Sequence, residues 1–291
     1  MREFTVYAPA KLNLFLDVID KRPDGYHNIE TIFEKIDLRD EVVIRERPVV
    51  SGLEISVEPA AVCPGGRGNI VYKALTMLLS EANADLGLEI IIKKKIPVAA
   101  GLGGGSSDAA AVLRAVNDKF GLGVSRDRLF AIASLTGKDV PFFLLDNTFA
   151  AACGTGEDLK AIDVDWDISH IIIKPDAPKS TKEMYSRLDY YSSDFGKGDI
   201  EKVTSAIKTR NLVFLQKSYY NIFEKALGYN SGPVSAAKKI LRDSGARPGF
   251  LSGSGPSVFC VFKDRGEAMK IAKGLPRKQG MEVFVASSCK N

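Results

Sequence analysis

Cysteine and histidine are scarce in this chain of 291 residues, and their spacing does not suit a metal site. No two cysteines form a C-x-x-C pair, and His27 and His170 lie far apart in the sequence. The pattern therefore disfavours a structural zinc site. Cysteine is also too sparse for a disulfide scaffold, so we expect a reducing, cytoplasmic location. The cysteines are Cys63, Cys153, Cys260 and Cys289.

Long hydrophobic runs and a strong net charge are absent as well. No window of about 18 residues is continuously apolar, which excludes a membrane-spanning helix. The first residues include Arg2, Glu3 and Lys11 instead of an apolar run, so we expect no secretory signal. Lys and Arg total 40 against 36 for Asp and Glu, a net charge of +4. This surplus permits an anionic small-molecule partner and does not indicate nucleic acid.

The composition is that of a globular protein. Apolar residues make up 45% of the chain and charged residues 26%, which excludes disorder throughout. The length corresponds to one large or two modest domains. Strands cluster early and helices dominate 180–245, a pattern that indicates an α+β fold rather than regular alternation. We therefore expect two domains, 1–158 and 159–291.

Hydrophobic periodicity predicts the individual elements. Helices are predicted at 69–82, 106–120, 126–136, 181–188, 199–210, 214–227, 234–244 and 265–275. Strands are predicted at 4–7, 12–19, 41–47, 53–57, 88–95, 149–153, 171–174, 257–262 and 282–286.

The strongest local feature is the glycine-rich segment 97–107, which leads directly into an alanine-rich helical run. Such a loop offers unpaired backbone N–H groups and the positive end of a helix dipole, which together bind phosphate. Ser106 and Ser107 are expected to cap the helix and to present hydroxyls to phosphate or Mg²⁺. Asp108 would repel phosphate, so it is expected to point away. The structural alternative is a flexible loop with an ordinary serine cap.

Two common nucleotide-binding motifs are missing. G-x-x-x-x-G-K-[ST] occurs nowhere, and G-x-G-x-x-G counted from Gly101 ends on Ser106. P-loop and Rossmann proteins are therefore disfavoured. A second glycine cluster at 251–257 precedes a predicted strand. It is either a tight turn or a second loop that closes over phosphates.

Lys11 and Asp139 are charged residues beside apolar stretches. Lys11 is either an edge residue whose ammonium reaches solvent or a cation that serves a transferred phosphoryl group. Asp139 is either a turn or cap aspartate, or a partly desolvated base. Tyr26 and His27 follow a turn, and they either form a self-contained turn cluster or bind a planar ring by stacking and hydrogen bonding.

Three segments together resemble the GHMP kinases, the superfamily of galactokinase, homoserine kinase, mevalonate kinase and phosphomevalonate kinase. They are PAKLNL at 9–14, PVAAGLGGGSS at 97–107 and SGSGPS at 252–257. RPDGYH at 22–27, NIV at 69–71 and DVPFF at 139–143 are similar to the branch that acts on a cytidine diphosphate substrate of the non-mevalonate isoprenoid pathway. The resemblance spans about residues 5–262.

The resemblance implies a two-domain kinase with its active site in the interdomain cleft. Its reaction would be ATP-dependent phosphorylation of the 2-hydroxyl of a methylerythritol moiety. Asp139 matches the base that takes the hydroxyl proton, and Lys11 matches the cation that orients it and offsets transition-state charge. ATP and Mg²⁺ are implied, with Ser107 as a candidate metal ligand. The expected partner is the cytidine diphosphate substrate, without nucleic acid or membrane, and the chain is expected to be a monomer or homodimer.

Further residues match the family's binding positions. Tyr26 and Tyr185 would stack on the cytosine, and His27 would hydrogen-bond it. The residues implied to bind ATP are Asn69, Lys95, Pro97, Ala99, Ala100, Gly101, Leu102, Gly103, Gly104, Gly105, Ser106 and Ser107. The residues implied to bind the substrate are Asn13, Tyr26, His27, Tyr185, Gly253 and Ser254.

Two departures from the family pattern and two other functions stay open. Lys138 would lower the pKa of Asp139 if it lies close. The segment 247–250 is also atypical. A homoserine or mevalonate type of kinase would leave Tyr26, His27 and Tyr185 without a cytosine to hold. A nucleic-acid-binding module is disfavoured, because the basic residues are scattered among nearly as many acids.

Overall fold

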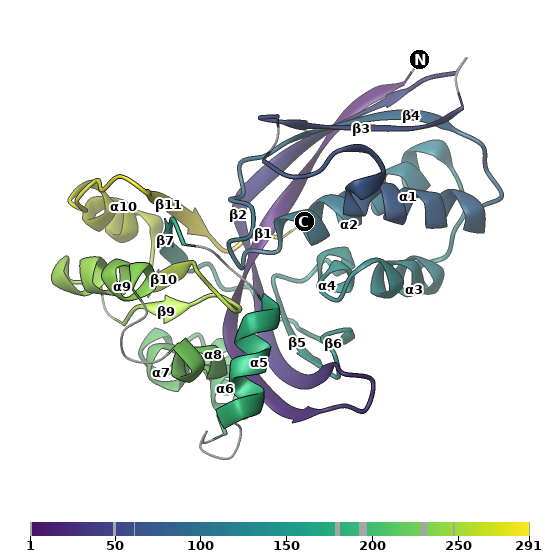
Figure 1. Ribbon diagram of the computed structural model, residues 1–291. Helices are drawn as coiled ribbons and strands as arrows, with labels where there is room; N and C mark the ends of the chain where they lie inside the picture. The colour runs from purple at the N-terminus through teal and green to yellow at the C-terminus, as the bar shows by residue number, and fades with distance from the viewer. Residues whose placement is uncertain are drawn as a thin grey trace.

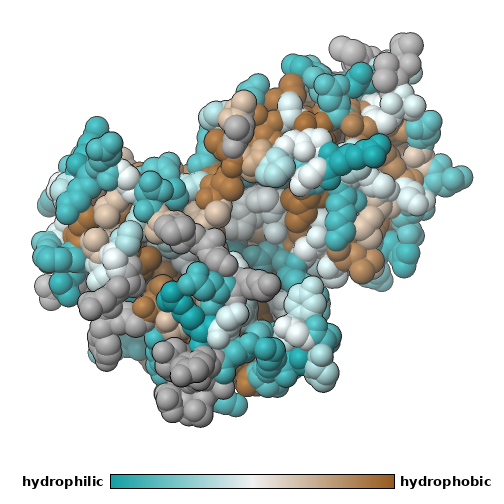
Figure 2. Space-filling view, in the orientation of Figure 1, coloured by the Kyte–Doolittle hydropathy of each residue, from teal (hydrophilic) through white to brown (hydrophobic). Residues whose placement is uncertain are grey.

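The computed structural model describes residues 2–48, 51–60, 62–177, 181–191, 197–227, 232–246 and 248–290. Helices and two separate sheets build two lobes, with the long strands β1 and β2 running between them (Figure 1). Figure 2 shows the surface indented between the lobes. In the part of the chain so described, every helix is too short or too polar to cross a membrane.

The first sheet has seven strands, in the order β3-β4-β2-β1-β8, with β5 paired to β2 and β6 paired to β5. β1 and β2 form an antiparallel hairpin that extends along most of the molecule. The strands of this seven-stranded sheet are β1 (Glu3–Lys21), β2 (His27–Glu46), β3 (Gly52–Glu58), β4 (Gly87–Lys93), β5 (Phe149–Cys153), β6 (Asp158–Ile162) and β8 (Tyr220–Asn221).

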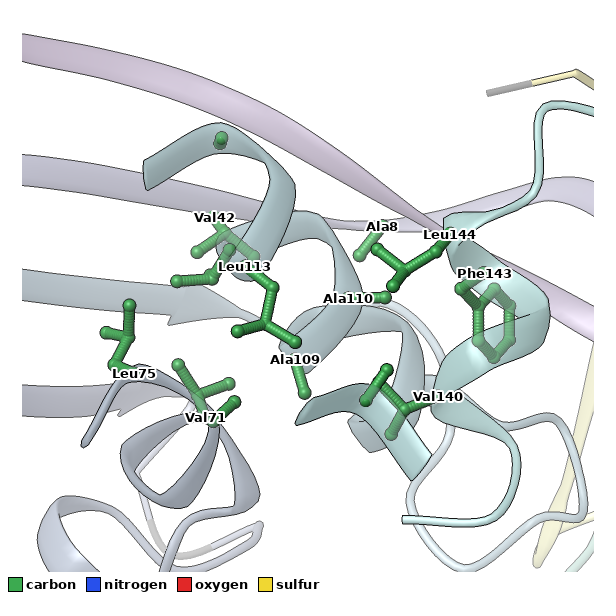
Figure 3. Packing of buried hydrophobic residues seen from close by; sticks show 14 of the residues in the cluster. Ala8, Val42, Val71, Leu75, Ala109, Ala110, Leu113, Val140, Phe143 and Leu144 are labelled. Atoms are coloured by element: carbon green, nitrogen blue, oxygen red, sulfur yellow. The ribbon is translucent and has the colours of Figure 1, made fainter. Parts of the chain in front are cut away.

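Helices cover one face of this sheet (Figure 1). They are η1 (Gly66–Gly68), α1 (Ile70–Glu81), α2 (Gly104–Phe120), α3 (Arg126–Thr136) and α4 (Val140–Leu144). Val71 and Leu75 from α1 meet Leu113 from α2 and Val42 from β2 in a buried cluster (Figure 3). This apolar burial fixes α2, and with it the glycine-rich loop that precedes it, against the sheet.

The second lobe is built on a four-stranded antiparallel sheet in the order β11-β7-β10-β9. Its strands are β7 (Ser169–Pro175), β9 (Phe250–Leu251), β10 (Val258–Phe262) and β11 (Met281–Ser287). The helices of this half are α5 (Thr181–Tyr191), α6 (Ile200–Lys208), α7 (Leu212–Ser218), α8 (Ile222–Leu227), α9 (Pro233–Asp243) and α10 (Arg265–Lys273). Leu12 and Leu14 of β1 share a buried cluster with Phe259 of β10, so one core joins the two lobes.

The first predicted strand pair is wrong, because 4–7 and 12–19 belong to one continuous strand, β1. A register shift between Pro9 and Ala10 accommodates the proline in the pairing with β2. On its other side β1 is paired with β8 only at Phe15 and Leu16, so Pro9 breaks no second ladder. The prediction also left out residues 27–40 of β2 and the short elements η1, α4, β6, β8 and β9.

The single helix predicted at 214–227 is also wrong. The chain leaves the helical conformation at Tyr219, which separates α7 from α8. The Tyr219 ring stacks on Phe250 at 3.9 Å between centroids, and its hydroxyl donates to the carbonyl of Leu251. Contacts distant in sequence therefore outweigh the local helical pattern at this point.

The domain boundary expected between residues 158 and 159 stays a prediction. β6 runs across it, since residues Asp158–Ile162 pair with β5 in the first sheet.

Candidate active site

A cavity of about 470 Å³ lies between the lobes, and most of the predicted site residues line it. Its walls come from β1, the loop before α2, α5 and the loop after β9. The predicted residues found in the wall are Lys11, Asn13, Asn69, Pro97, Ala99, Ala100, Gly101, Leu102, Gly103, Gly104, Gly105, Ser106, Asp139, Tyr185, Gly253 and Ser254. Four predicted residues are outside this wall: Tyr26, His27, Lys95 and Ser107.

The glycine-rich loop ends directly in α2. Gly103 is the N-cap residue, with φ of 72°, and the helix begins at Gly104. No side chain caps the helix, so the prediction that Ser106 or Ser107 does so is wrong; the helix starts two residues earlier than predicted. The first N–H groups of α2 are therefore available to an anion in the cavity, assisted by the helix dipole.

Close packing explains why this loop requires glycine. A Cβ on Gly101 would lie 2.4 Å from the carbonyl oxygen of Ser252, and a Cβ on Gly103 would lie 2.8 Å from Cγ of Lys11. The hydroxyl of Ser252 also donates to the carbonyl of Gly101 at 3.0 Å. The two glycine clusters of the sequence thus contact each other at the wall of one cavity.

Lys11 and Asp139 form an ion pair in the wall of this cavity. Nζ of Lys11 lies 3.5 Å from Oδ2 of Asp139. The Lys11 side chain is only 6% exposed, so it is not an edge residue reaching solvent, whereas that of Asp139 is 34% exposed. Asp139 occupies the N-cap position of α4 but makes no capping hydrogen bond with its side chain. The carboxylate is therefore left open to the cavity.

A chain of buried hydrogen bonds fixes the lysine. Nζ of Lys11 donates to Oδ1 of Asn13 at 2.5 Å, and the amide nitrogen of Asn13 donates to the hydroxyl of Thr31 at 2.8 Å. The Thr31 hydroxyl in turn donates to the carbonyl of Phe15 at 2.6 Å. Because each partner is buried on the β1–β2 hairpin, the ammonium has one position relative to the sheet.

Lys94, not the predicted Lys95, is the lysine of this segment that lines the cavity. Its ammonium lies 2.5 Å from Asp40 and 2.8 Å from Asp108. Burial raises the pKa of Asp108 to about 7. Burial also opposes the charge on Lys94, but Asp108 and Asp40 outweigh it and raise the pKa of this lysine. The Lys95 side chain is exposed, and its role stays a prediction.

Ser107 is a buried residue of α2 itself and lines a small separate depression, so the structure does not bring this candidate metal ligand to the cavity. Its hydroxyl has no hydrogen-bond partner among the described residues. The neighbouring Ser106 lies in the cavity wall instead.

His27 is held by α5. Its ring stacks on Tyr185, with centroids 4.7 Å apart and planes at 25°, and its Nε2 lies 2.7 Å from Oδ1 of Asp189. His27 and Asp189 line a second cavity of about 500 Å³, while Tyr185 lines the first. The stacked pair therefore contributes to the walls of both cavities. Sequence reasoning missed Asp189, although it follows Tyr185 by one helical turn.

Tyr26 is 58% exposed, and Nζ of Lys138 lies 5.5 Å from the centre of its ring. Lys138 also pairs with Glu157 at 3.5 Å. In the second atypical segment, Arg247 lies outside the described residues, and Phe250 packs on Tyr219.

Known proteins match this chain along nearly its whole length. Residues 69–147 match the GHMP kinases N terminal domain, and residues 203–280 match the GHMP kinases C terminal domain. The 4-diphosphocytidyl-2-C-methyl-D-erythritol kinase of Acetivibrio thermocellus is 36% identical, covering 99% of this chain and 100% of that protein. The enzyme of the same name from Geobacter metallireducens is 38% identical, covering 94% and 95%.

Solved structures of GHMP kinases also match the fold of this chain. A crystal structure of 4-(cytidine 5'-diphospho)-2C-methyl-D-erythritol kinase matches with a TM-score of 0.81 and 31% identity, covering 98% of both chains. Homoserine kinase from Cytophaga hutchinsonii shares the fold, with a TM-score of 0.74 at 21% identity. The chain belongs to the GHMP kinases, in the branch formed by the 4-diphosphocytidyl-2-C-methyl-D-erythritol kinases. The predicted α+β, two-domain kinase fold is confirmed, and the protein is a small-molecule kinase.

Proposed function

We propose that this protein transfers the γ-phosphoryl group of ATP to the 2-hydroxyl of 4-diphosphocytidyl-2-C-methyl-D-erythritol, giving the 2-phosphate and ADP for isoprenoid precursor synthesis. The observation that carries this proposal is the Lys11–Asp139 pair in the same cavity as the glycine-rich start of α2. A base beside a phosphate cradle is what phosphoryl transfer to an alcohol requires. The relatives' names supply the substrate.

The chain's residues divide the chemistry between them. Asp139 accepts the proton of the attacking hydroxyl as the new P–O bond forms. Lys11 holds the Asp139 carboxylate toward the cavity and offsets negative charge in the transition state. Asn13 and Thr31 keep Lys11 in place through the hydrogen bonds described above. Positioning and electrostatics thus supply most of the catalysis.

The site fits ATP with Mg²⁺. The open N–H groups at the start of α2 suit phosphate, and the glycines there leave no Cβ in the way. The hydroxyl of Ser106 lines the same cavity and is a hard oxygen ligand of the kind Mg²⁺ prefers. Bound Mg²⁺ supplies charge neutralisation on the phosphates. No group of three or more His, Cys, Asp or Glu suited to a metal occurs in the described residues, so the nucleotide would complete the coordination.

The cytidine end belongs near the His27–Tyr185 stack. Both rings present flat apolar faces, and His27 adds a hydrogen-bonding nitrogen. Tyr26, exposed on the same hairpin, can cover the base once it is bound. The rings of His27 and Tyr185 are already in contact, so the base stacks outside this pair.

The remaining expectations are also proposals. The four cysteines are free thiols, which supports a reducing cytoplasm. The absence of nucleic-acid binding and a monomeric or homodimeric state stay predictions.

A phosphoryl-transfer assay tests the proposal. Purified protein with Mg-ATP is offered the diphosphocytidyl substrate, mevalonate or homoserine under identical conditions. We expect turnover only with the first. Turnover with mevalonate or homoserine at a comparable kcat/KM would overturn the substrate assignment while leaving the kinase class intact.

A further inference from the structure

Asp189 connects α5 to the β1–β2 hairpin. It lies four residues after Tyr185, so the two side chains occupy one face of the helix. Both contact His27, Tyr185 by stacking and Asp189 by the 2.7 Å hydrogen bond to Nε2. On its other oxygen Asp189 is paired with Nζ of Lys21 at 2.5 Å. The histidine is therefore fixed in both position and orientation.

The direction of the hydrogen bond follows from the charge on Asp189. Hydrogen bonds from Lys21 and His27 lower the pKa of Asp189 below its usual range, so the group is a carboxylate at neutral pH. A carboxylate only accepts hydrogen bonds, so Nε2 of His27 carries the shared hydrogen. In the neutral form an imidazole has one N–H, and in that form Nδ1 of His27 is left as an acceptor.

We propose that Asp189 selects the nucleobase: by fixing the hydrogen of His27 on Nε2, it leaves Nδ1 to accept a hydrogen bond from the amino group of cytosine. This step rests on the proposed function, in which His27 meets the base. Uracil carries a keto oxygen where cytosine carries the amino group, so with uracil two acceptors would face each other. A polar site built for one partner rejects the mismatched one strongly, because a group loses its hydrogen bond. Asp189 acts through His27 and is a positioning residue.

The kinetic test uses Asp189→Asn. Lys21 only donates, so it keeps the amide oxygen of the new asparagine as its acceptor and leaves the amide nitrogen facing Nε2. That nitrogen donates to Nε2, which moves the imidazole hydrogen to Nδ1 and turns Nδ1 into a donor. Wild type and variant are compared at pH 8 with the cytidine and the uridine form of the substrate, and by the Kd of CDP and UDP, which requires no turnover. We expect the cytidine preference to fall by about tenfold or more in the variant, with an unchanged KM for ATP. Arg187→Met is the control, since it removes the exposed ion pair with Glu183 on the same helix and leaves the contacts of Asp189 in place; its preference stays at the wild-type value.

The tautomer itself can be observed by ¹⁵N NMR, because His27 and His170 are the only histidines in the chain. At pH 8 we expect the hydrogen of His27 on Nε2 in wild type and on Nδ1 in Asp189→Asn, with His170 unchanged. A wild-type His27 with its hydrogen on Nδ1, or with both nitrogens protonated, overturns the proposal even if the variant does not fold. A switched tautomer with an unchanged CDP-to-UDP preference also overturns it.

The outcomes separate this proposal from the function it rests on. Discrimination between CDP and UDP that depends on Asp189, without phosphoryl transfer to the cytidine substrate, overturns the proposed reaction alone. Phosphoryl transfer with a base preference that ignores Asp189 overturns the selection mechanism alone.

Discussion

Nζ of Lys11 lies 3.5 Å from Oδ2 of Asp139, and the two residues come from different parts of the fold, β1 and the start of α4. The lysine is buried and bound to Asn13, while the carboxylate is one-third exposed to the cavity. The pair therefore has a fixed member and an accessible one. This division suits a base that must meet a substrate hydroxyl while keeping its orientation.

Replacing the base should abolish most turnover. Asp139→Asn keeps the shape of the side chain but cannot accept the proton, so kcat should fall by about two to four orders of magnitude. Binding of ATP and substrate, measured by calorimetry, should change by less than about threefold. Asp163→Asn, at an exposed loop position, is the control and should behave as wild type. A kcat for Asp139→Asn within about tenfold of wild type would show that another group takes the proton.

A methyl group in the phosphate loop should damage catalysis through Lys11. Gly103→Ala places a Cβ 2.8 Å from Cγ of Lys11 and 3.0 Å from the Phe143 ring, at a φ of 72°. Gly123→Ala is the matched control, since Gly123 has a φ of 71° and nothing within 4 Å of the added Cβ. Both variants should lose about 1–2 kcal/mol in the free energy of unfolding by denaturant titration, because both force alanine into the left-handed region. Gly103→Ala should lose more, because its Cβ also clashes with Lys11 and Phe143. Only Gly103→Ala should also lose kcat, and equal kinetics in the two variants would contradict this account.

Binding of the cytidine end of the substrate should depend on His27, whereas binding of ATP should not. His27→Ala removes both the stack on Tyr185 and the hydrogen bond to Asp189, so KM for the cytidine substrate should rise by about tenfold or more. KM for ATP should stay nearly constant. Asn28→Ala serves as control, since the Asn28 amide donates to Asp20 at the neighbouring position. Equal increases in both KM values would place His27 outside the substrate site.

Lys35 should make stability depend on pH. It is fully buried on β2 and donates to the carbonyl of Leu145, and burial, with a smaller effect from Arg114, lowers its pKa to about 7. An unfolded lysine keeps a pKa of about 10.4, so between roughly pH 7 and 10 the unfolded chain binds more protons than the folded one. This group therefore contributes a free energy of unfolding that rises with pH across that window.

Lys35→Met tests this contribution, because methionine nearly keeps the size of the side chain but does not titrate. Urea unfolding of both proteins at pH 7 and pH 9.5 should show wild type gaining stability relative to the variant at the higher pH. The same difference between the proteins at both pH values would mean that the folded Lys35 titrates as the unfolded one does.

Several elements were predictable because their signals are local. The prediction of a helix at 126–136 matches α3, since Ser125 caps its first turn and Gly137 ends it. Asn69 likewise caps α1. The glycine-rich segment before α2 identified the phosphate end of the cavity, because the need for glycine is visible in composition alone.

Other features could not be predicted because they depend on contacts across the fold. β4 ends at Lys93, so strand alternation could not distinguish Lys94 from Lys95. The break at Tyr219 depends on the Phe250 ring. Asp189 looked like any surface aspartate of a helix until His27 was placed beside it.

The sequence by itself determined the chemistry available to this protein: a glycine loop opening a helix, a lysine and an aspartate beside apolar stretches, and a histidine after a turn. These are properties of residue type and near neighbours, which the order of the chain records. The tertiary structure alone decided which groups meet. Burial of the β1–β2 hairpin in the core joining both lobes brings Lys11 to Asp139 and His27 to Asp189, because hydrophobic packing, and not sequence proximity, sets the distance between them.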